Sequence, residues 1–125
     1  MFATIIFAGG NGGPPKFEED VSLMAVSLLL VAPVCEEVFF RGLLQGFLLR
    51  RGYFGLSIVL PGILFSVMHV IPFYSAGPAL LISIMTGALI LGLIAGYFRA
   101  VRGSLLHAVL THFWFNLVGY IAMFL

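Results

Sequence analysis

Apolar residues fill four long segments of this chain, and polar residues gather in short stretches between them. The apolar segments cover about residues 21–49, 54–71, 78–98 and 104–125. Each meets the length of roughly 17–20 residues that an α-helix needs to cross a hydrocarbon core of about 30 Å. Backbone polar groups find no water inside lipid, so helices are the structure we predict for all four segments. The pattern therefore predicts an all-α, polytopic membrane bundle of about four transmembrane helices.

The links between these segments are short, which predicts a compact antiparallel bundle. The links cover residues 50–53, 72–77 and 99–103. The first segment is longer than a bilayer requires, so we expect it to tilt, to kink near Pro33 or to extend into the interface. Glycines four residues apart would let helix backbones approach closely, and two such pairs occur, Gly42 with Gly46 and Gly92 with Gly96.

The first 20 residues do not share the pattern of long spans. An apolar run ends at about residue 8 and has no basic residue before it, which does not fit a signal peptide. Residues 11–20 then collect glycine, proline and acidic side chains, a composition typical of a loop. We therefore predict an N-terminal stump and loop over residues 1–20 and a core domain over residues 21–125. The short stump also fits the tail of a helix from a longer chain.

The composition is typical of a chain whose solvent is the bilayer. Hydrophobic residues make up 62% of the sequence and charged residues 9%, against roughly 45–50% and 25% in soluble domains. A net charge of +1 provides no field that would attract nucleic acid, so we expect membrane lipid and no nucleic acid among the partners. The single cysteine, Cys35, rules out an internal disulfide, and we expect it to be a small buried side chain.

Most of the basic residues lie in the links at one end of the predicted bundle. These are Arg50, Arg51, Arg99 and Arg102, four of the six basic residues. An antiparallel arrangement brings all four to the same face of the membrane. Because basic residues favour the cytoplasmic side, we predict that this face is cytoplasmic and that the links at residues 11–20 and 72–77 lie on the other side.

Two adjacent glutamates and an arginine interrupt the first apolar segment, at Glu36, Glu37 and Arg41. Glu37 lies about 13 residues, or roughly 20 Å of helix, before Arg50, so its side chain does not reach the interface. Burial of such groups costs about 2.5–3.5 kcal/mol each even on the lenient insertion scale, so they normally have a partner or a function. Glu37 and Arg41 share a helix face and should form an ion pair. Glu36 is rotated by about 100° from Glu37 and is left free for chemistry.

Two histidines and an amide lie on other apolar segments at a comparable depth. They are His69, His112 and Asn116, with Asn116 one helical turn after His112. Counted from the arginine-rich ends of their helices, Glu36 and His69 are each about 14 residues away and His112 about 9 or 10. These side chains could meet in one cavity between the midplane and the far face, whereas His107 should lie nearer the arginine face.

Buried Glu and His residues serve other purposes besides catalysis. The three charged residues of the first segment could simply hold helix register, and ion paths also use such groups. A small transporter, a proton-relay subunit or an immunity protein that binds a bacteriocin is therefore the alternative to an enzyme. A proton path would stagger these groups through the whole bilayer, whereas here they cluster at one depth. The clustering favours a reaction centre.

At these positions the chain resembles the CAAX prenyl protease and bacteriocin-processing (Abi) family of intramembrane proteases. The family's pattern of two glutamates, three residues and an arginine is matched at residues 36–41, EEVFFR. Its phenylalanine and histidine pattern is matched at residues 65–69, FSVMH, and its histidine and asparagine pattern at residues 112–116, HFWFN. The resemblance covers about residues 21–116. It implies an endopeptidase embedded in the membrane, which we expect to be the plasma membrane of a prokaryote.

The resemblance also implies a substrate class and a division of roles. Members remove the terminal tripeptide from prenylated CAAX proteins, or act in bacteriocin maturation or immunity, so a peptide or a lipidated protein is the implied substrate. Glu36 and His69 are then expected to activate the attacking water, and His112 and Asn116 to stabilise the oxyanion. A cytosolic substrate would need access from the cytosol, whereas the arginines place the site in the opposite half of the bilayer. The alternatives are a reversed orientation, lateral entry from lipid, or a substrate that is not cytosolic.

Zinc is the alternative to metal-free chemistry in such a site. Glu36, His69 and His112 would supply one carboxylate and two imidazoles, a ligand set common in catalytic zinc sites. Glu37 would then be the carboxylate left to act as base, although the resemblance implies that it braces the site together with Arg41. The chain also lacks the His-Glu-x-x-His helix motif. We therefore favour water activation that requires no cofactor.

Overall fold

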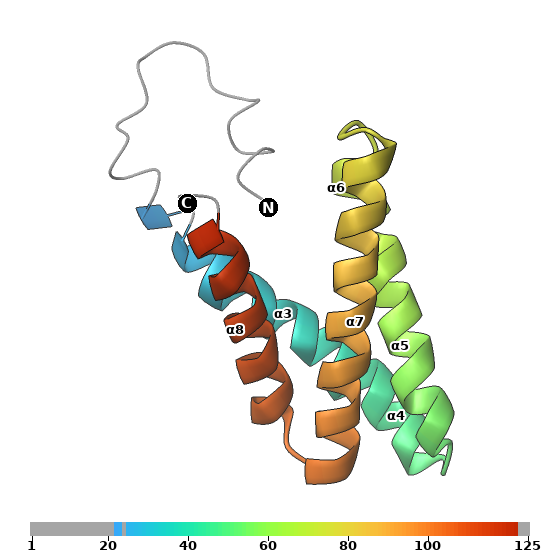
Figure 1. Ribbon diagram of the computed structural model, residues 1–125. Helices are drawn as coiled ribbons and strands as arrows, with labels where there is room; N and C mark the ends of the chain where they lie inside the picture. The colour runs from blue at the N-terminus through green and yellow to red at the C-terminus, as the bar shows by residue number, and fades with distance from the viewer. Residues whose placement is uncertain (1–21, 24, 123–125) are drawn as a thin grey trace.

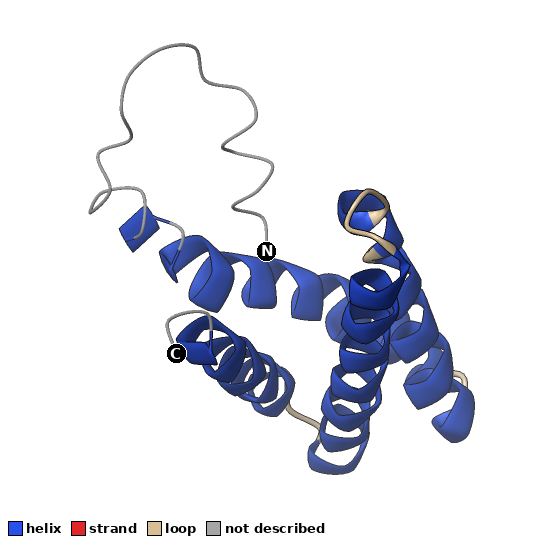
Figure 2. Cartoon of the chain, turned by 45° about the horizontal axis from the view of Figure 1, so that its top comes forward, coloured by secondary structure: helices blue, strands red, loops and turns tan. Residues whose placement is uncertain are grey.

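The computed structural model describes residues 22–23 and 25–122, and every regular element in this part of the chain is helical (Figure 2). The elements are η1 (Ser27–Val31), α3 (Ala32–Glu37), η2 (Val38–Leu44), α4 (Gln45–Arg50), α5 (Phe54–Met68), α6 (Val70–Phe73), α7 (Pro78–Arg102) and α8 (Leu105–Ala122). The all-α prediction is confirmed. The stump and loop predicted for residues 1–20 lie outside the described residues.

The elements η1, α3, η2 and α4 follow one another without a break and form one continuous first helix. The backbone N–H of Ala32 donates to Ser27 O, and that of Gln45 to Phe40 O, both across five residues as in a π-helix. Pro33 lacks an N–H and cannot make the usual α-helical bond. The deviation expected near Pro33 thus takes the form of the π turn that precedes it.

Three helices of the described chain are long and apolar enough to cross a membrane. They cover Phe54–Phe73, Pro78–Arg102 and Leu105–Ala122. The first helix differs from these three because Glu36, Glu37 and Arg41 lie within it. The structure thus agrees with a polytopic membrane bundle in which the first helix carries charged residues near its middle.

The first helix runs obliquely across the other helices and connects the two sides of the bundle (Figure 1). Its N-terminal part, η1 and α3, packs on α8, and its C-terminal part, η2 and α4, packs on α5. Helix α7 contacts both α5 and α8. Residues near the middle of the first helix therefore face several helices at once, and the polar side chains meet there.

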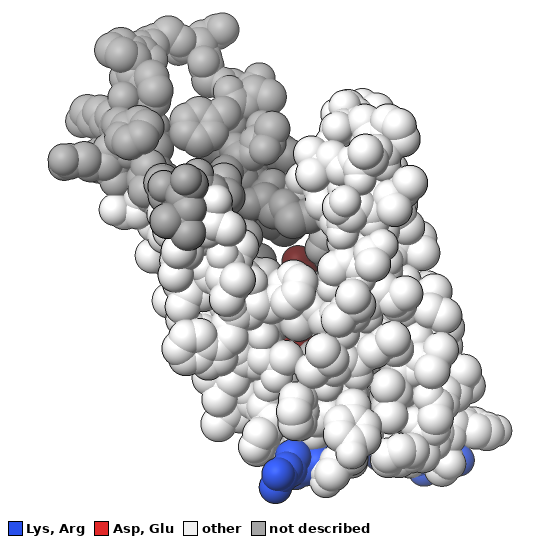
Figure 3. Space-filling view, in the orientation of Figure 1, with Lys and Arg blue, Asp and Glu red and all other residues white. Residues whose placement is uncertain are grey.

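The arginine-rich ends of the helices gather at one end of the molecule (Figure 3). Arg50 lies in the last turn of α4, and Arg99 and Arg102 lie in the last turn of α7. Gly103 follows with a φ of 68° and donates its N–H to Arg99 O at 3.1 Å, which ends α7 directly before α8 begins. The common location of the arginines is as predicted, while the assignment of this end to the cytoplasm stays a prediction.

The interior of the bundle is partly polar. Its buried polar residues are Glu37, Arg41, Gln45, Ser57, Ser66 and His112, and its buried hydrophobic residues are Phe40, Leu48, Phe65, Ala88, Leu91, Ala95 and Ala108. Many large apolar side chains, such as Ile82 and Val118, point outward instead. Lipid provides no hydrophobic force between helices, so close packing and hydrogen bonds must hold them together.

Helices α5 and α7 approach each other closely where two glycines meet. A Cβ added at Gly92 would lie 3.0 Å from Gly62 Cα and 3.2 Å from Gly62 O. At Gly96, a Cβ would lie 3.5 Å from the Ile58 backbone O. The close approach predicted for Gly92 and Gly96 is confirmed, whereas Gly42 and Gly46 meet no described backbone of another helix within 4 Å.

Gly92→Ala is expected to destabilise the bundle by about 1–3 kcal/mol, the usual cost of overpacking. The new methyl group would collide with backbone atoms of Gly62, which cannot rotate away. Gly119→Ala is the matched control, because a Cβ there meets no described atom within 4 Å. Thermal unfolding of the detergent-purified proteins, followed by circular dichroism, measures the difference, and equal midpoints for both variants would contradict the close approach.

Cys35 is exposed, so the prediction of a buried side chain is wrong. Cys35 lies two residues before Glu37, which rotates it by about 200° from the face that Glu37 turns inward. Its thiol therefore lies on the outer side of the first helix.

Candidate functional site

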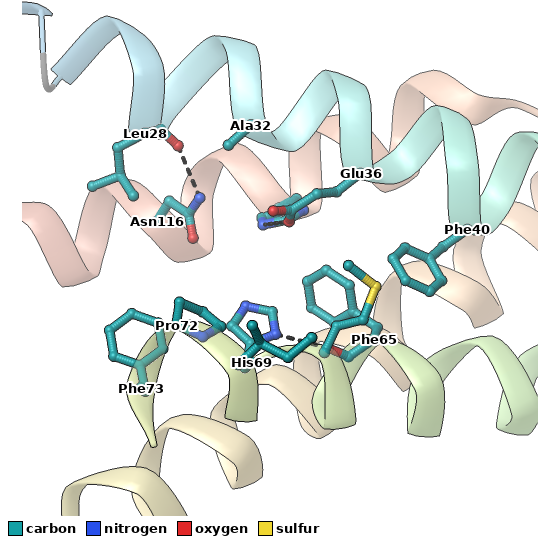
Figure 4. A pocket seen from close by; sticks show the side chains of 12 residues that line it. Leu28, Ala32, Glu36, Phe40, Phe65, His69, Pro72, Phe73 and Asn116 are labelled. Carbon is teal, nitrogen blue, oxygen red and sulfur yellow. Dashed lines mark hydrogen bonds and ion pairs between the residues drawn. The ribbon is translucent and has the colours of Figure 1, made fainter. Parts of the chain in front are cut away.

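A cavity of about 340 Å³ lies between the first helix, α5, α6 and α8 (Figure 4). Its polar lining consists of Glu36, His69, His112 and Asn116, and its apolar lining of Leu28, Ala32, Phe40, Phe65, Met68, Ile71, Pro72 and Phe73. The four polar residues come from three different helices. The side chains expected to meet at one depth therefore do line one cavity.

Glu37 is the central acceptor of the buried polar network. Its Oε1 accepts hydrogen bonds from Arg41 Nη1 at 3.0 Å and from His112 Nδ1 at 2.9 Å. The side chains of Glu37 and Arg41 are both 0% exposed. The predicted ion pair is present, and it also connects the first helix to α8 through His112.

Glu36 is the more open of the two carboxylates. Its side chain is 23% exposed, and its nearest ionic partner is His112 Nε2 at 3.6 Å from Oε2. Acidic atoms are visible in a recess on the side of the bundle, away from the arginine end (Figure 3). Glu36 thus reaches the cavity while Glu37 stays buried, as the helical rotation between them predicts.

His69 lies at the turn between α5 and α6. Pro72 has no N–H to donate to the carbonyl of residue 68, and its ring crowds that carbonyl, so the α-helix deviates at this point. His69 Nδ1 lies 2.7 Å from Phe65 O. A carbonyl oxygen can only accept, so Nδ1 carries the hydrogen and Nε2 is the nitrogen available to a ligand in the cavity.

Asn116 connects α8 to the N-terminal part of the first helix. Its Nδ2 donates to Leu28 O at 2.9 Å (Figure 4). An amide nitrogen carries two hydrogens, so one N–H of Asn116 is left for a group bound in the cavity.

The ring of Phe65 packs between the two histidines. Its centroid lies 4.8 Å from that of His69 and 5.4 Å from that of His112, edge to face in both cases. The Arg41 guanidinium lies over the same ring at 4.8 Å. Phe65 is 1% exposed, so it both closes one wall of the cavity and restricts the two imidazoles.

Gln45 is not among the residues predicted from the sequence, although it is completely buried. Its Nε2 donates to Gly96 O at 2.7 Å, one turn after Arg41 Nη2 donates to Gly92 O at 3.0 Å. A signal was present, because an amide one turn after Arg41 within an apolar segment marks the same helix face. Its acceptor belongs to Gly96, which the spacing from Gly92 marks as a position of close approach but not as the partner of Gln45.

The donor set does not match a three-ligand metal site. Within the described residues, no three His, Cys, Asp or Glu side chains are grouped closely enough to hold an ion. Both imidazoles do bond an oxygen through Nδ1, a feature that metal-ligating histidines often share. Zinc held by Glu36, His69 and His112 therefore stays the alternative to a metal-free reaction.

Comparison with known proteins relates this chain to a family of membrane proteases. A family model described as "Type II CAAX prenyl endopeptidase Rce1-like" matches residues 18–118, which include every residue of the cavity's polar lining. No curated protein matches the chain, and no solved structure does.

Proposed function

Because this chain belongs to the Rce1-like family of type II CAAX prenyl endopeptidases, we propose that it hydrolyses a peptide bond within the membrane by means of a water activated by Glu36 and His69. The observation that carries the proposal is the convergence of the four polar side chains on one cavity in an otherwise apolar bundle. Three helices long and apolar enough to cross a membrane support an integral membrane location, and we propose the plasma membrane of a prokaryote.

In the proposed reaction, the Glu36 carboxylate takes a proton from the water while the water oxygen attacks the substrate carbonyl carbon. His69 Nε2 accepts a hydrogen bond from the same water and orients it. The C–N bond then breaks, and the proton held by Glu36 passes to the leaving amine. A general base of this kind contributes about 10²–10⁴-fold to the rate.

His112 and Asn116 are proposed to stabilise the oxyanion that forms on the carbonyl oxygen. Asn116 supplies the N–H that it does not donate to Leu28. His112 already donates Nδ1 to Glu37, so donation from Nε2 requires the imidazolium form. The adjacent Glu37 carboxylate would stabilise that imidazolium, in addition to forming the ion pair with Arg41.

The apolar lining favours a substrate with apolar or lipid-modified residues beside the scissile bond. We propose a peptide or a lipidated protein, such as one with a prenylated C-terminal cysteine. The cavity lies toward the end of α5 opposite the arginines. If the arginine end is cytoplasmic, such a substrate reaches the site sideways from the bilayer or from the extracytoplasmic side.

His69→Ala is expected to lower kcat/KM for peptide cleavage by about 10²–10⁴-fold, because it removes the ring nitrogen that orients the water. The assay uses the purified protein in liposomes and a quenched fluorescent peptide that ends in a prenylated cysteine and three further residues. His107→Ala is the matched control, since His107 is an exposed histidine on α8 outside the cavity lining. Equal loss in both variants, or no loss in His69→Ala, would contradict the proposed role.

The same assay repeated with a strong chelator separates the metal-free reaction from the zinc alternative. We expect the wild-type protein to keep its rate after chelation, with no zinc found by elemental analysis. A loss of activity that added zinc restores would favour the zinc alternative instead.

A further inference from the structure

Gln45 is a buried polar residue outside the cavity, and nothing in the proposed reaction uses it directly. We propose that Gln45 is a positioning residue of the site, whose hydrogen bond to α7 holds the first helix in the axial register that keeps Glu36 and Glu37 against His112. The inference rests on the proposed function for its kinetic readout, and it also has a readout that does not require activity.

Two parallel hydrogen bonds connect the first helix to α7. Arg41 Nη2 donates to Gly92 O at 3.0 Å, and Gln45 Nε2 donates to Gly96 O at 2.7 Å. Donors and acceptors are each four residues apart, so successive turns of the first helix bond successive turns of α7 where the two helices cross. A slip by one helical turn, about 5.4 Å, would misplace both bonds.

Arg41 connects this contact between the first helix and α7 to the residues of the cavity. The same guanidinium donates Nη1 to Glu37 Oε1 at 3.0 Å, and that oxygen accepts from His112 Nδ1 at 2.9 Å. A continuous series of bonds therefore leads from the backbone of α7 to the histidine on α8. Without the Gln45 bond, Arg41 would have to bond both α7 and Glu37 with no second hydrogen bond beside it on the Gly96 turn.

The surface of α7 is suited to this contact because glycines expose its carbonyl groups. A Cβ at Gly92 would lie 3.3 Å from Arg41 Nη2 and would crowd the guanidinium. A carbonyl oxygen has two lone pairs, so Gly92 and Gly96 can accept a side-chain donor in addition to their helical bonds.

The hydrogen bonds of Gln45 indicate that its side chain positions the first helix and adds little to the stability of the fold. Its Nε2 is bonded, but its Oε1 is buried without a hydrogen-bond partner among the described residues. An unpaired buried acceptor offsets much of the stability that the donor side provides. An apolar side chain of similar shape should therefore keep the fold, while losing the directional bond that sets the register.

Gln45→Met in the full chain tests this role, because methionine matches glutamine in length and has no N–H. We expect kcat to fall by about 10- to 100-fold, as small misplacements of catalytic groups do, with KM within about twofold and the unfolding midpoint unchanged. Ser57→Ala is the matched control, since Ser57 is equally buried and its hydroxyl donates to Phe54 O within its own turn. An unchanged kcat, or a fall in kcat that accompanies a lower unfolding midpoint, would overturn the proposal.

The activity-independent readout is the ¹⁵N spectrum of histidine-labelled protein. Gln45→Met should shift the Nδ1 signal of His112, which reports the bond to Glu37, and leave His107 unchanged, whereas Ser57→Ala should change neither. An unmoved His112 signal overturns the positioning role. If the wild-type protein cleaves no peptide but Gln45→Met still shifts the His112 signal, the proposed function fails while the register role stands.

Discussion

Glu36→Gln is expected to lower kcat for peptide cleavage by at least about 10²–10⁴-fold, the contribution of a general base. The substitution keeps the size of the side chain and removes its ability to take a proton. Glu36 is the carboxylate that faces the cavity, and its nearest ionic partner, His112 Nε2, is 3.6 Å away. The change therefore breaks no short bond, and the protein should unfold at the same temperature as the wild type.

A neighbouring substitution shows whether the loss is specific to the carboxylate. Cys35→Ala alters the exposed residue directly before Glu36 and should leave the rate unchanged. The measurement is the initial rate of peptide cleavage in liposomes, together with thermal unfolding of each variant. A Glu36→Gln protein that retains more than half of the wild-type rate would rule out Glu36 as the base.

Arg41→Met is expected to reduce the free energy of unfolding by about 3–5 kcal/mol, the usual cost of removing one partner of a buried ion pair. Glu37 would keep its charge at 0% exposure with only His112 as a partner. The bond from Arg41 to the Gly92 carbonyl would be lost as well. Chemical or thermal unfolding in detergent, followed by circular dichroism, measures the change.

The double variant Glu37→Leu with Arg41→Met is the matched comparison. It removes both charges, so it should recover much of the stability that Arg41→Met loses. Activity should stay low, because Nδ1 of His112 then loses the Glu37 carboxylate to which it donates. An Arg41→Met protein that unfolds like the wild type would mean that the ion pair does not brace the site.

The local parts of the site could be predicted from the sequence because helical geometry determines them. Glu37 and Arg41 are four residues apart, and the ion pair between them needs no knowledge of the other helices. The different environments of Glu36 and Glu37 follow from the same rotation. Counting residues from the helix ends was enough to place His69 and His112 in the same half of the bilayer as Glu36, and the structure brings all three to one cavity.

Contacts that depend on how the helices cross could not be predicted in this way. The bond from His112 to Glu37 spans 75 positions and exists because the first helix passes obliquely over α8. The acceptor of Gln45 is the carbonyl of Gly96, and its pairing with Gln45 depends on where the first helix crosses α7. The outward position of Cys35 likewise depended on which face of the first helix packs inward.

Hydrolysis in ¹⁸O-labelled water, followed by mass spectrometry of both the product and the protein, tests the central claim most directly. The claim is that Glu36 and His69 activate a water that attacks the peptide bond. The predicted result is cleavage by the wild-type protein, with ¹⁸O in the new C-terminal carboxylate and none in the protein fragment that contains Glu36. The contradicting result is ¹⁸O in the Glu36 side chain, which would make that carboxylate the nucleophile, or the absence of any cleavage.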